Sequence, residues 1–254
     1  MSLISPENYQ IIRSLTVKDL KLKYKNSILG YFWSLLHPVI YISIFYVVFS
    51  QAFPAVENYS LYVISGILFW TFFATSSSQI INSIVGNASI IKSIYIPSYY
   101  FALSMMMSGL VNLILALVPF LFIMWFLGAP FGFHLIMVIP VTILLGVFTY
   151  GLSLGLCSLN VFYRDVSILW LSLSPAMFYA TPVAYTIDLI PQEWLWLFRL
   201  NPLVHYFEAI HNILYDGEWL SLNQLLIMIG ISLLFLLIGQ SIYKKLEKGF
   251  VSNL

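Results

Sequence analysis

The stretch Leu15-Thr-Val-Lys-Asp-Leu-Lys-Leu-Lys-Tyr-Lys-Asn-Ser-Ile-Leu-Gly-Tyr-Phe-Trp-Ser-Leu-Leu-His-Pro38, continued without a charge through 39–49, decides the fold class. Its first half is basic, and its second half begins an apolar run that is long enough to cross a bilayer as a helix, which takes about 20 residues. Spacing of four residues places side chains on one ribbon of a helix. This ribbon is aromatic, because it carries Trp33, His37, Tyr41, Phe45 and Phe49.

The composition excludes a soluble protein. The chain has 254 residues, of which 61% are hydrophobic and 8% charged, whereas soluble domains carry about 25% charged residues. We expect an integral membrane protein with no cleavable signal at its polar N-terminus. The single cysteine, Cys157, cannot form an intrachain disulfide. With a net charge of +1, we expect no nucleic-acid partner.

The apolar residues form six continuous runs of membrane-spanning length. Continuous runs favour helices over the alternating pattern of membrane strands. We therefore predict an all-α integral membrane protein with one domain, 1–254. The predicted spans are Phe32–Phe53, Tyr59–Ile81, Tyr99–Phe126, His134–Asn160, Ser167–Ile187 and Leu222–Tyr243.

The basic residues set the predicted orientation, since Lys and Arg accumulate on the cytoplasmic side of membrane proteins. Ten of them fall on one side of the predicted topology, and only Arg199 falls on the other. Both termini are therefore expected in the cytoplasm. The ten are Arg13, Lys18, Lys21, Lys23, Lys25, Lys92, Arg164, Lys244, Lys245 and Lys248.

The N-terminal segment is predicted to form two short helices. Pro6 opens the first, and a capping-box-like pair of Thr16 and Asp19 opens the second. In the second, Val17, Leu20 and Tyr24 share one face, and Lys18, Lys21 and Lys25 share another. This pattern fits a helix in the membrane interface with its cations near anionic head groups. A plain topology-setting anchor is the equally weighted alternative.

Two connections are predicted to carry short helices. The connection 82–98 holds Asn87 and Ser89 as candidate caps, then Ile91, Lys92 and Ser93, and a stop at Pro97. It predicts an amphipathic cytoplasmic helix that either docks a soluble partner or lies on lipid.

The connection 188–221 predicts two re-entrant helices on the outer side. Pro191 begins the first, which carries Trp194 and Trp196, and Asn201-Pro202 begins the second. The second is expected to place Leu203, Phe207, Ile210 and Leu214 on one face and to end near Asp216-Gly217.

The predicted spans lack Asp, Glu, Lys and Arg, whereas ion-coupled transporters and pumps keep ionisable groups in the membrane. The chain also lacks the Gly-x-x-x-x-Gly-Lys-Ser/Thr phosphate loop, so energy for transport must come from a separate subunit. The His205-x-x-Glu208-x-x-His211 spacing leaves its two imidazoles about 120° out of line, which disfavours a metal site. Gly151-x-x-x-Gly155 predicts close helix packing.

The aromatic residues of the first and fifth spans have two interpretations. They pack helices and contact lipid, or they line a path for sugars, whose C–H faces stack on aromatic rings. In the fifth span these residues are Trp170, Phe178, Tyr179 and Tyr185.

The basic segment with Tyr24-Lys-Asn-Ser-Ile-Leu-Gly-Tyr-Phe-Trp-Ser-Leu-Leu-His-Pro38 resembles the opening signature of bacterial polysaccharide exporter permeases, the membrane subunits of type-2 ABC transporters. The connection 82–98, Tyr163-Arg-Asp-Val166 and Asn201-Pro-Leu-Val-His-Tyr-Phe-Glu208 match in the same order. The resemblance implies a homodimer in the bacterial inner membrane, bound to two ABC ATPase subunits that hold ATP and Mg. The implied substrate is a lipid-linked glycan, with O-antigen favoured over capsule and teichoic acid.

The resemblance also implies roles for single residues. The aromatic residues of spans one and five would line the channel, and 87–93 would couple to the ATPase. Lys18, Lys21, Tyr24, Lys25, Gly30 and Tyr31 would form an entrance gate that attracts the lipid phosphate. The outer gate would hold Trp194, Trp196, Asn201, Pro202, His205 and Glu208. The alternatives are an exporter of small hydrophobic drugs or lipids, and an intramembrane enzyme or a structural membrane protein.

Overall fold

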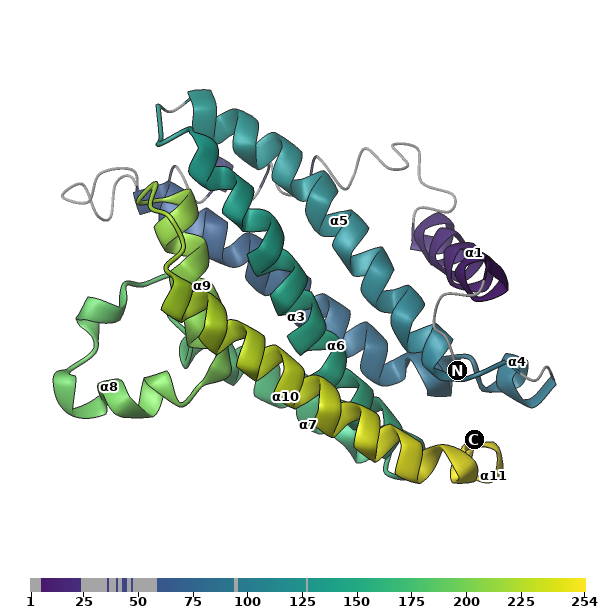
Figure 1. Ribbon diagram of the computed structural model, residues 1–254. Helices are drawn as coiled ribbons and strands as arrows, with labels where there is room; N and C mark the ends of the chain where they lie inside the picture. Colours follow the sequence, from purple (N-terminus) through teal and green to yellow (C-terminus); the bar gives the residue numbers. More distant parts are fainter. Residues whose placement is uncertain are drawn as a thin grey trace.

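The computed structural model describes residues 6–23, 36, 40, 43, 44, 47, 59–93, 96–126 and 128–254, and every element in these ranges is a helix (Figure 1). The elements are α1 (Pro6–Lys23), α3 (Tyr59–Gly86), α4 (Ala88–Ser93), α5 (Tyr99–Phe126), η1 (Phe133–Met137), α6 (Val138–Phe162), α7 (Asp165–Tyr179), η2 (Ile187–Leu189), α8 (Gln192–Arg199), α9 (Pro202–Leu214), α10 (Leu222–Leu246), η3 (Glu247–Gly249) and α11 (Phe250–Asn253).

Four helical stretches in the described ranges are long and apolar enough to cross a membrane: 59–93, 99–126, 133–162 and 222–253. They run side by side, with α4 and the C-terminus at one end of the bundle and α8 and α9 at the other (Figure 1). Four predicted spans are thereby confirmed as helices. The predicted span Phe32–Phe53 lies mostly outside the described residues.

The predicted fifth span is shorter than expected. Its helix, α7, has 15 residues and ends at Tyr179 rather than at Ile187. At 1.5 Å per residue it measures about 22 Å, less than the roughly 30 Å of a hydrocarbon core. Pro182 explains the early end, because proline has no N–H to donate and disfavours helical backbone in the preceding residue.

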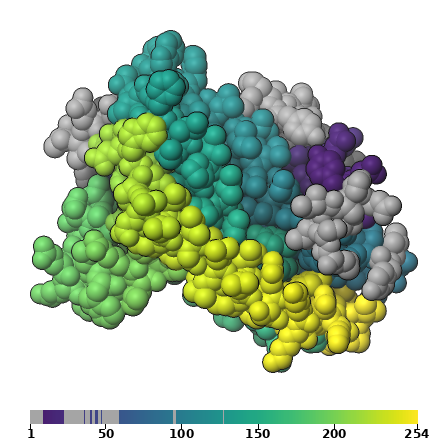
Figure 2. Space-filling model, viewed as in Figure 1, coloured from purple at the N-terminus to yellow at the C-terminus, as the bar shows by residue number. Residues whose placement is uncertain are grey.

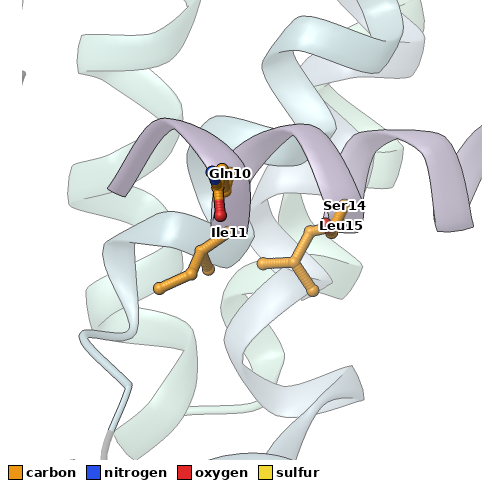
Figure 3. A pocket seen from close by; sticks show the side chains of 4 residues that line it. All are labelled: Gln10, Ile11, Ser14 and Leu15. Carbon is orange, nitrogen blue, oxygen red and sulfur yellow. The ribbon is translucent and has the colours of Figure 1, made fainter. Parts of the chain in front are cut away.

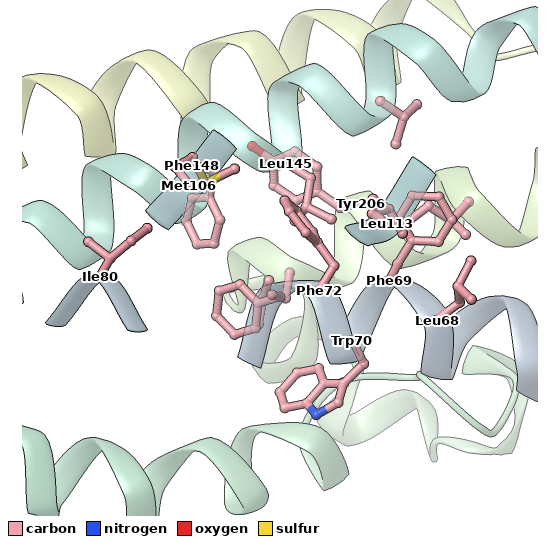
Figure 4. Packing of buried hydrophobic residues seen from close by; sticks show 14 of the residues in the cluster. Leu68, Phe69, Trp70, Phe72, Ile80, Met106, Leu113, Leu145, Phe148 and Tyr206 are labelled. Carbon is pink, nitrogen blue, oxygen red and sulfur yellow. The ribbon is translucent and has the colours of Figure 1, made fainter. Parts of the chain in front are cut away.

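The core is built around α3, which lies against α5, α6, α7 and α9. Its buried side chains Phe69 and Phe72 lie in one cluster with Phe148 of α6 and Met106 of α5 (Figure 4), and the Phe73 ring stacks on Phe148. In a lipid environment such dense packing replaces the hydrophobic effect as the main attraction between helices.

The predicted glycine contact joins α6 to α10. A methyl group on Gly239 would lie 1.9 Å from the Gly151 carbonyl oxygen, and one on Gly151 would lie 2.5 Å from the Leu236 N, whereas one on Gly155 would make an ordinary contact 3.4 Å from the Gly239 Cα. The two backbones therefore approach closely only because Gly151 and Gly239 have no side chain, in line with the GxxxG pattern.

The N-terminal segment forms one helix, α1, rather than the two that we predicted. Thr16 does not cap a second helix, because its hydroxyl donates to the Ile12 carbonyl one turn back (2.8 Å). Thr16 is buried against α5, where Ser104 Oγ donates to Asp19 Oδ2 (3.2 Å). The polar pair that we interpreted as a cap instead fastens α1 to α5.

Candidate functional site

The chain between α7 and α8 turns back with no α-helix and only the short 3-10 helix η2, and side chains from other parts of the chain bind its carbonyl groups. The Tyr59 hydroxyl donates to Ala184 O, and the Tyr62 hydroxyl donates to Tyr185 O (3.0 Å). Both tyrosines lie in the first turn of α3. Since non-helical backbone at membrane depth must be satisfied by protein or water, these bonds allow the turn to lie against the bundle.

Asn201 ties this turn to the start of α9. Its Oδ1 accepts a hydrogen bond from the Leu203 N–H (3.1 Å), which caps the helix as predicted. Its Nδ2 donates to Ala180 O (3.0 Å) and to Thr181 Oγ1 (2.8 Å). Pro202 occupies the first turn, where a missing N–H costs nothing. One side chain therefore closes the neck of the loop 182–200.

α9 is buried on most of its surface. Its predicted apolar face is confirmed, with Leu203, Phe207, Ile210 and Leu214 all enclosed against α3, α6 and α10. The predicted end of the helix is also confirmed, since it stops at Leu214 before Gly217, whose φ is 71°.

A close contact fixes α9 against α3. The His211 ring stacks on Tyr62 with centroids 3.7 Å apart. A methyl group on Gly66 would lie 2.9 Å from His211 Nε2 and 1.9 Å from the Val183 carbonyl oxygen. The backbone of α3 can pass this junction only because residue 66 is glycine.

Polar groups gather where α8 meets α9. His205 Nε2 lies 3.2 Å from the Arg199 carbonyl oxygen. Burial raises the pKa of the half-buried Glu208 carboxyl, while the charges of His205 and Arg199 lower it and Asp188 raises it. Glu208 therefore lies within electrostatic range of His205, Arg199 and Asp188 at the α9 end of the bundle.

α8 differs from its neighbour, because it has no buried residue. Trp194 is 55% exposed and Trp196 is 63% exposed. The helix protrudes from the bundle, and its green surface forms the lower left edge of the molecule in Figure 2.

The short helix predicted in the connection 82–98 is confirmed as α4, at the opposite end of the bundle (Figure 1). Ile91 is buried, whereas Ser89, Lys92 and Ser93 are exposed, so one face anchors the helix and the other is free. The Asn87 amide donates back to Ser83 O in α3 (2.8 Å).

The predicted aromatic lining of the fifth span divides into two groups. Trp170 is buried and donates to Ser77 Oγ (3.0 Å), and Phe178 packs edge-on against Trp70. Tyr179 is 75% exposed, and Tyr185 donates its hydroxyl to Tyr179 O (2.8 Å). Of these four residues, only Tyr179 and Tyr185 have polar aromatic side chains that are not packed between helices.

Most of the predicted entrance and first-span residues lie outside the described residues: Tyr24, Lys25, Gly30, Tyr31, Trp33, His37, Tyr41, Phe45 and Phe49. Lys18 and Lys21 are exposed on α1. A hollow of about 400 Å³ borders the same helix. Ile11 and Leu15 point from α1 toward the helices beneath it, with Gln10 and Ser14 beside them (Figure 3).

The two histidines of the metal-like spacing do not converge. His205 lies beside Arg199, whereas His211 stacks on Tyr62. Within 6–23, 59–93, 96–126 and 128–254, no group of three His, Cys, Asp or Glu side chains gathers as a metal site.

Several residues of this junction escaped the sequence analysis. Tyr59 and Tyr62 begin a span, where tyrosine is common for interfacial reasons, and Gly66 has no partner glycine nearby in sequence. For the two tyrosines, the one available signal in the sequence is their i, i+3 spacing, which puts both hydroxyls on one face of α3.

These features define a multi-pass helical membrane protein whose long helices carry no ionised residue in their apolar centres. The profile of the ABC-2 type transporter family matches residues 10–215. Two O-antigen export system permease proteins RfbA of Klebsiella pneumoniae are 33% and 31% identical, each over 97% of this chain and 95% of the relative. One from Myxococcus xanthus is 27% identical over 96% of this chain and 95% of the relative. The chain belongs to the ABC-2 type transporter family.

Proposed function

We propose that this chain is the channel-forming permease subunit of an ATP-driven exporter that moves a lipid-linked O-antigen polysaccharide across the bacterial cytoplasmic membrane. The observation that carries the proposal is the similarity to O-antigen export permeases over nearly the whole length of both proteins. Similarity of this extent includes the α7 to α9 junction as well as the long helices.

The uncharged helices support an outside source of energy. Neither an ion relay nor a phosphate loop lies in the sequence, so ATP and Mg would be bound by a separate ABC ATPase. α4 offers that subunit a docking surface through Ser89, Lys92 and Ser93. The count of Lys and Arg favours a cytoplasmic location for this end and for both termini.

A second copy of the chain would complete the channel. The exposed side of α7 carries large apolar side chains, among them Ile168 and Leu171, together with Ser172, Pro175 and Tyr179, and a second copy would cover part of this surface. In a homodimer this surface would form one wall, together with the first-span aromatic ribbon. Exposed Lys18 and Lys21 on α1 would attract the lipid phosphate at the entrance.

Deletion of the gene in its host, followed by complementation, tests the function. We expect the deletion to remove the polysaccharide from the cell surface and to leave the lipid-linked chain inside. Unchanged surface polysaccharide would refute the function, and altered drug or lipid export alone would favour the exporter of small hydrophobic molecules.

Cysteine crosslinking tests the ATPase contact. Ser89→Cys and Ser93→Cys should crosslink to cysteines on the co-expressed ATPase. Ile91→Cys, buried in the same helix, is the matched control and should not. Equal yields at the three positions, or no yield at any, would count against docking through this face.

A further inference from the structure

The two tryptophans of α8 have different neighbours. On a helix, side chains three and four positions apart lie together. Trp194 therefore adjoins Leu197 and Phe198, whereas Trp196 adjoins Gln192, Glu193, Arg199 and Leu200. The first tryptophan belongs to an apolar surface, and the second lies mainly among polar groups (an amide, a carboxylate and a guanidinium group) with one leucine beside them.

The packing of α8 shows which side faces away from the bundle. Leu195 and Phe198 are half-buried, while Trp196 is 63% exposed. At 100° per residue, Trp196 is 100° from Leu195 and about 160° from Phe198 around the helix. Trp196 thus lies on the side turned away from the packed residues.

Exposed Arg199 leads from this side of α8 toward the polar residues of α9. Arg199 lies one turn after Trp196, and its carbonyl oxygen is 3.2 Å from His205 Nε2. His205 and Arg199 both interact electrostatically with the half-buried Glu208. An exposed indole therefore lies one helical turn from a cation that interacts with an imidazole and a carboxylate of α9.

This set of groups matches the chemistry of a sugar ring. Its C–H face stacks on an aromatic ring, and its hydroxyl groups both donate and accept hydrogen bonds, as carboxylates, imidazoles and guanidinium groups require. A tryptophan that anchors a helix in the lipid interface is instead expected on the apolar face, and Trp194 occupies that position.

We propose that Trp196, Arg199, His205 and Glu208 form a subsite on the extracytoplasmic side that binds sugar residues of the exported polysaccharide. The proposal rests on the proposed function and adds a place where the emerging chain is held. Binding there would hinder the chain from sliding back between power strokes of the ATPase.

Binding of a defined glycan tests the subsite. The probe is the polysaccharide released by mild acid from the producing strain's surface lipopolysaccharide, titrated onto the full-length protein in lipid nanodiscs. We expect Trp196→Ala to raise the Kd at least tenfold and Trp196→Phe, which keeps a ring, to raise it less than threefold. Trp194→Ala, on the apolar face of the same helix, should change it less than twofold.

Three results of the binding experiment would overturn the subsite. They are a Trp196→Ala Kd equal to wild type, a Trp194→Ala loss as large as that of Trp196→Ala, and no binding by the wild-type protein. Glu208→Gln gives a second measurement on α9 and should weaken binding about threefold or more. Since α8 has no buried residue, its variants should elute from size exclusion like the wild type.

A lipid contact and a failed function give different results. The fluorescence of Trp196 is obtained by subtracting the fluorescence of Trp196→Phe from that of the wild type. Strong quenching of this fluorescence by brominated lipids would place the ring in the membrane and refute the subsite. If gene deletion removes surface polysaccharide but Trp196→Ala binds the glycan normally, only the subsite fails. If deletion leaves the surface polysaccharide intact, the proposed function fails.

Discussion

α8 and α9 are neighbouring amphipathic helices with opposite surroundings. α9 buries nine of its 13 residues, whereas α8 buries none of its eight. Both begin at a proline-containing turn and both carry aromatic residues. The difference is that α9 lies in contact with three long helices, and α8 contacts mainly α9. Amphipathic spacing therefore identifies an apolar face, but the rest of the chain decides what covers it.

The largest predicted effect separates the two helices directly. Phe207 of α9 is fully buried beside Trp70, so Phe207→Ala should lower the free energy of unfolding by about 3–5 kcal/mol. Leu197→Ala on exposed α8 should change it by less than about 0.5 kcal/mol. Unfolding by SDS titration in mixed micelles measures both.

Similar losses for these two variants would show that α8 is as firmly packed as α9. The contrast between the helices would then be wrong, and α8 would be a structural element. Binding of the polysaccharide by Leu197→Ala provides a check that the variant keeps its fold.

The second effect tests the contact that holds α9 against α3. Gly66→Ala places a methyl group 1.9 Å from the Val183 carbonyl oxygen, and we expect the backbone shift to cost about 1–3 kcal/mol. Gly230→Ala in α10 is the matched control, because nothing lies within 4 Å of the added methyl group. The control should be neutral or gain up to about 1 kcal/mol from helix propensity.

Thermal unfolding in detergent, followed by fluorescence-detected size exclusion, compares these glycine variants. A Gly66→Ala protein as stable as Gly230→Ala would mean that α3 and the Val183 turn are not in close contact. The anchoring of α9 would then have to come from its apolar face alone.

The sequence predicted the spans and α9 because continuous apolar runs and the Asn201-Pro202 cap are local signals. The prediction that the fifth span ends at Ile187 was wrong, because hydropathy does not report that the helix must end before Pro182. The residues after Tyr179 remain apolar, yet their carbonyl groups bind Tyr59 and Tyr62 instead of helical N–H groups.

The candidate site was predictable only in part. Trp196, His205 and Glu208 stood out from sequence as polar or aromatic residues of an outer loop, but their association with Arg199 depends on how α8 folds back onto α9. Likewise, Thr16 and Asp19 fit a capping pattern, and only the presence of Ser104 on α5 shows why they form a contact between helices.

A third variant asks how the neck between the two helices is held. Asn201→Ala removes both the cap of α9 and the donor to Ala180 O and Thr181 Oγ1, so we expect a loss of about 1–2 kcal/mol. Asn201→Ser keeps a capping oxygen and loses only the donor, so its loss should be about half as large. SDS titration measures both. Equal losses would show that the cap contributes nothing at this position.

The smallest effect concerns Glu208, the half-buried carboxyl that α8 and α9 share with His205 and Arg199. Burial raises its pKa in the folded protein above the ordinary 4.5, so the folded state holds this proton at pH values where the unfolded state has lost it. The resulting stability is fully present below the unfolded pKa and is lost as pH rises through the folded pKa.

Glu208→Gln cannot titrate, and its melting temperature should therefore rise relative to wild type as pH increases from 4.5 to 8. Glu193→Gln on α8 removes the same charge from an exposed position and is the matched control. If both variants differ from wild type by the same amount at every pH, Glu208 is as solvated as the residues of α8. The two helices would then not differ in burial at their shared polar group.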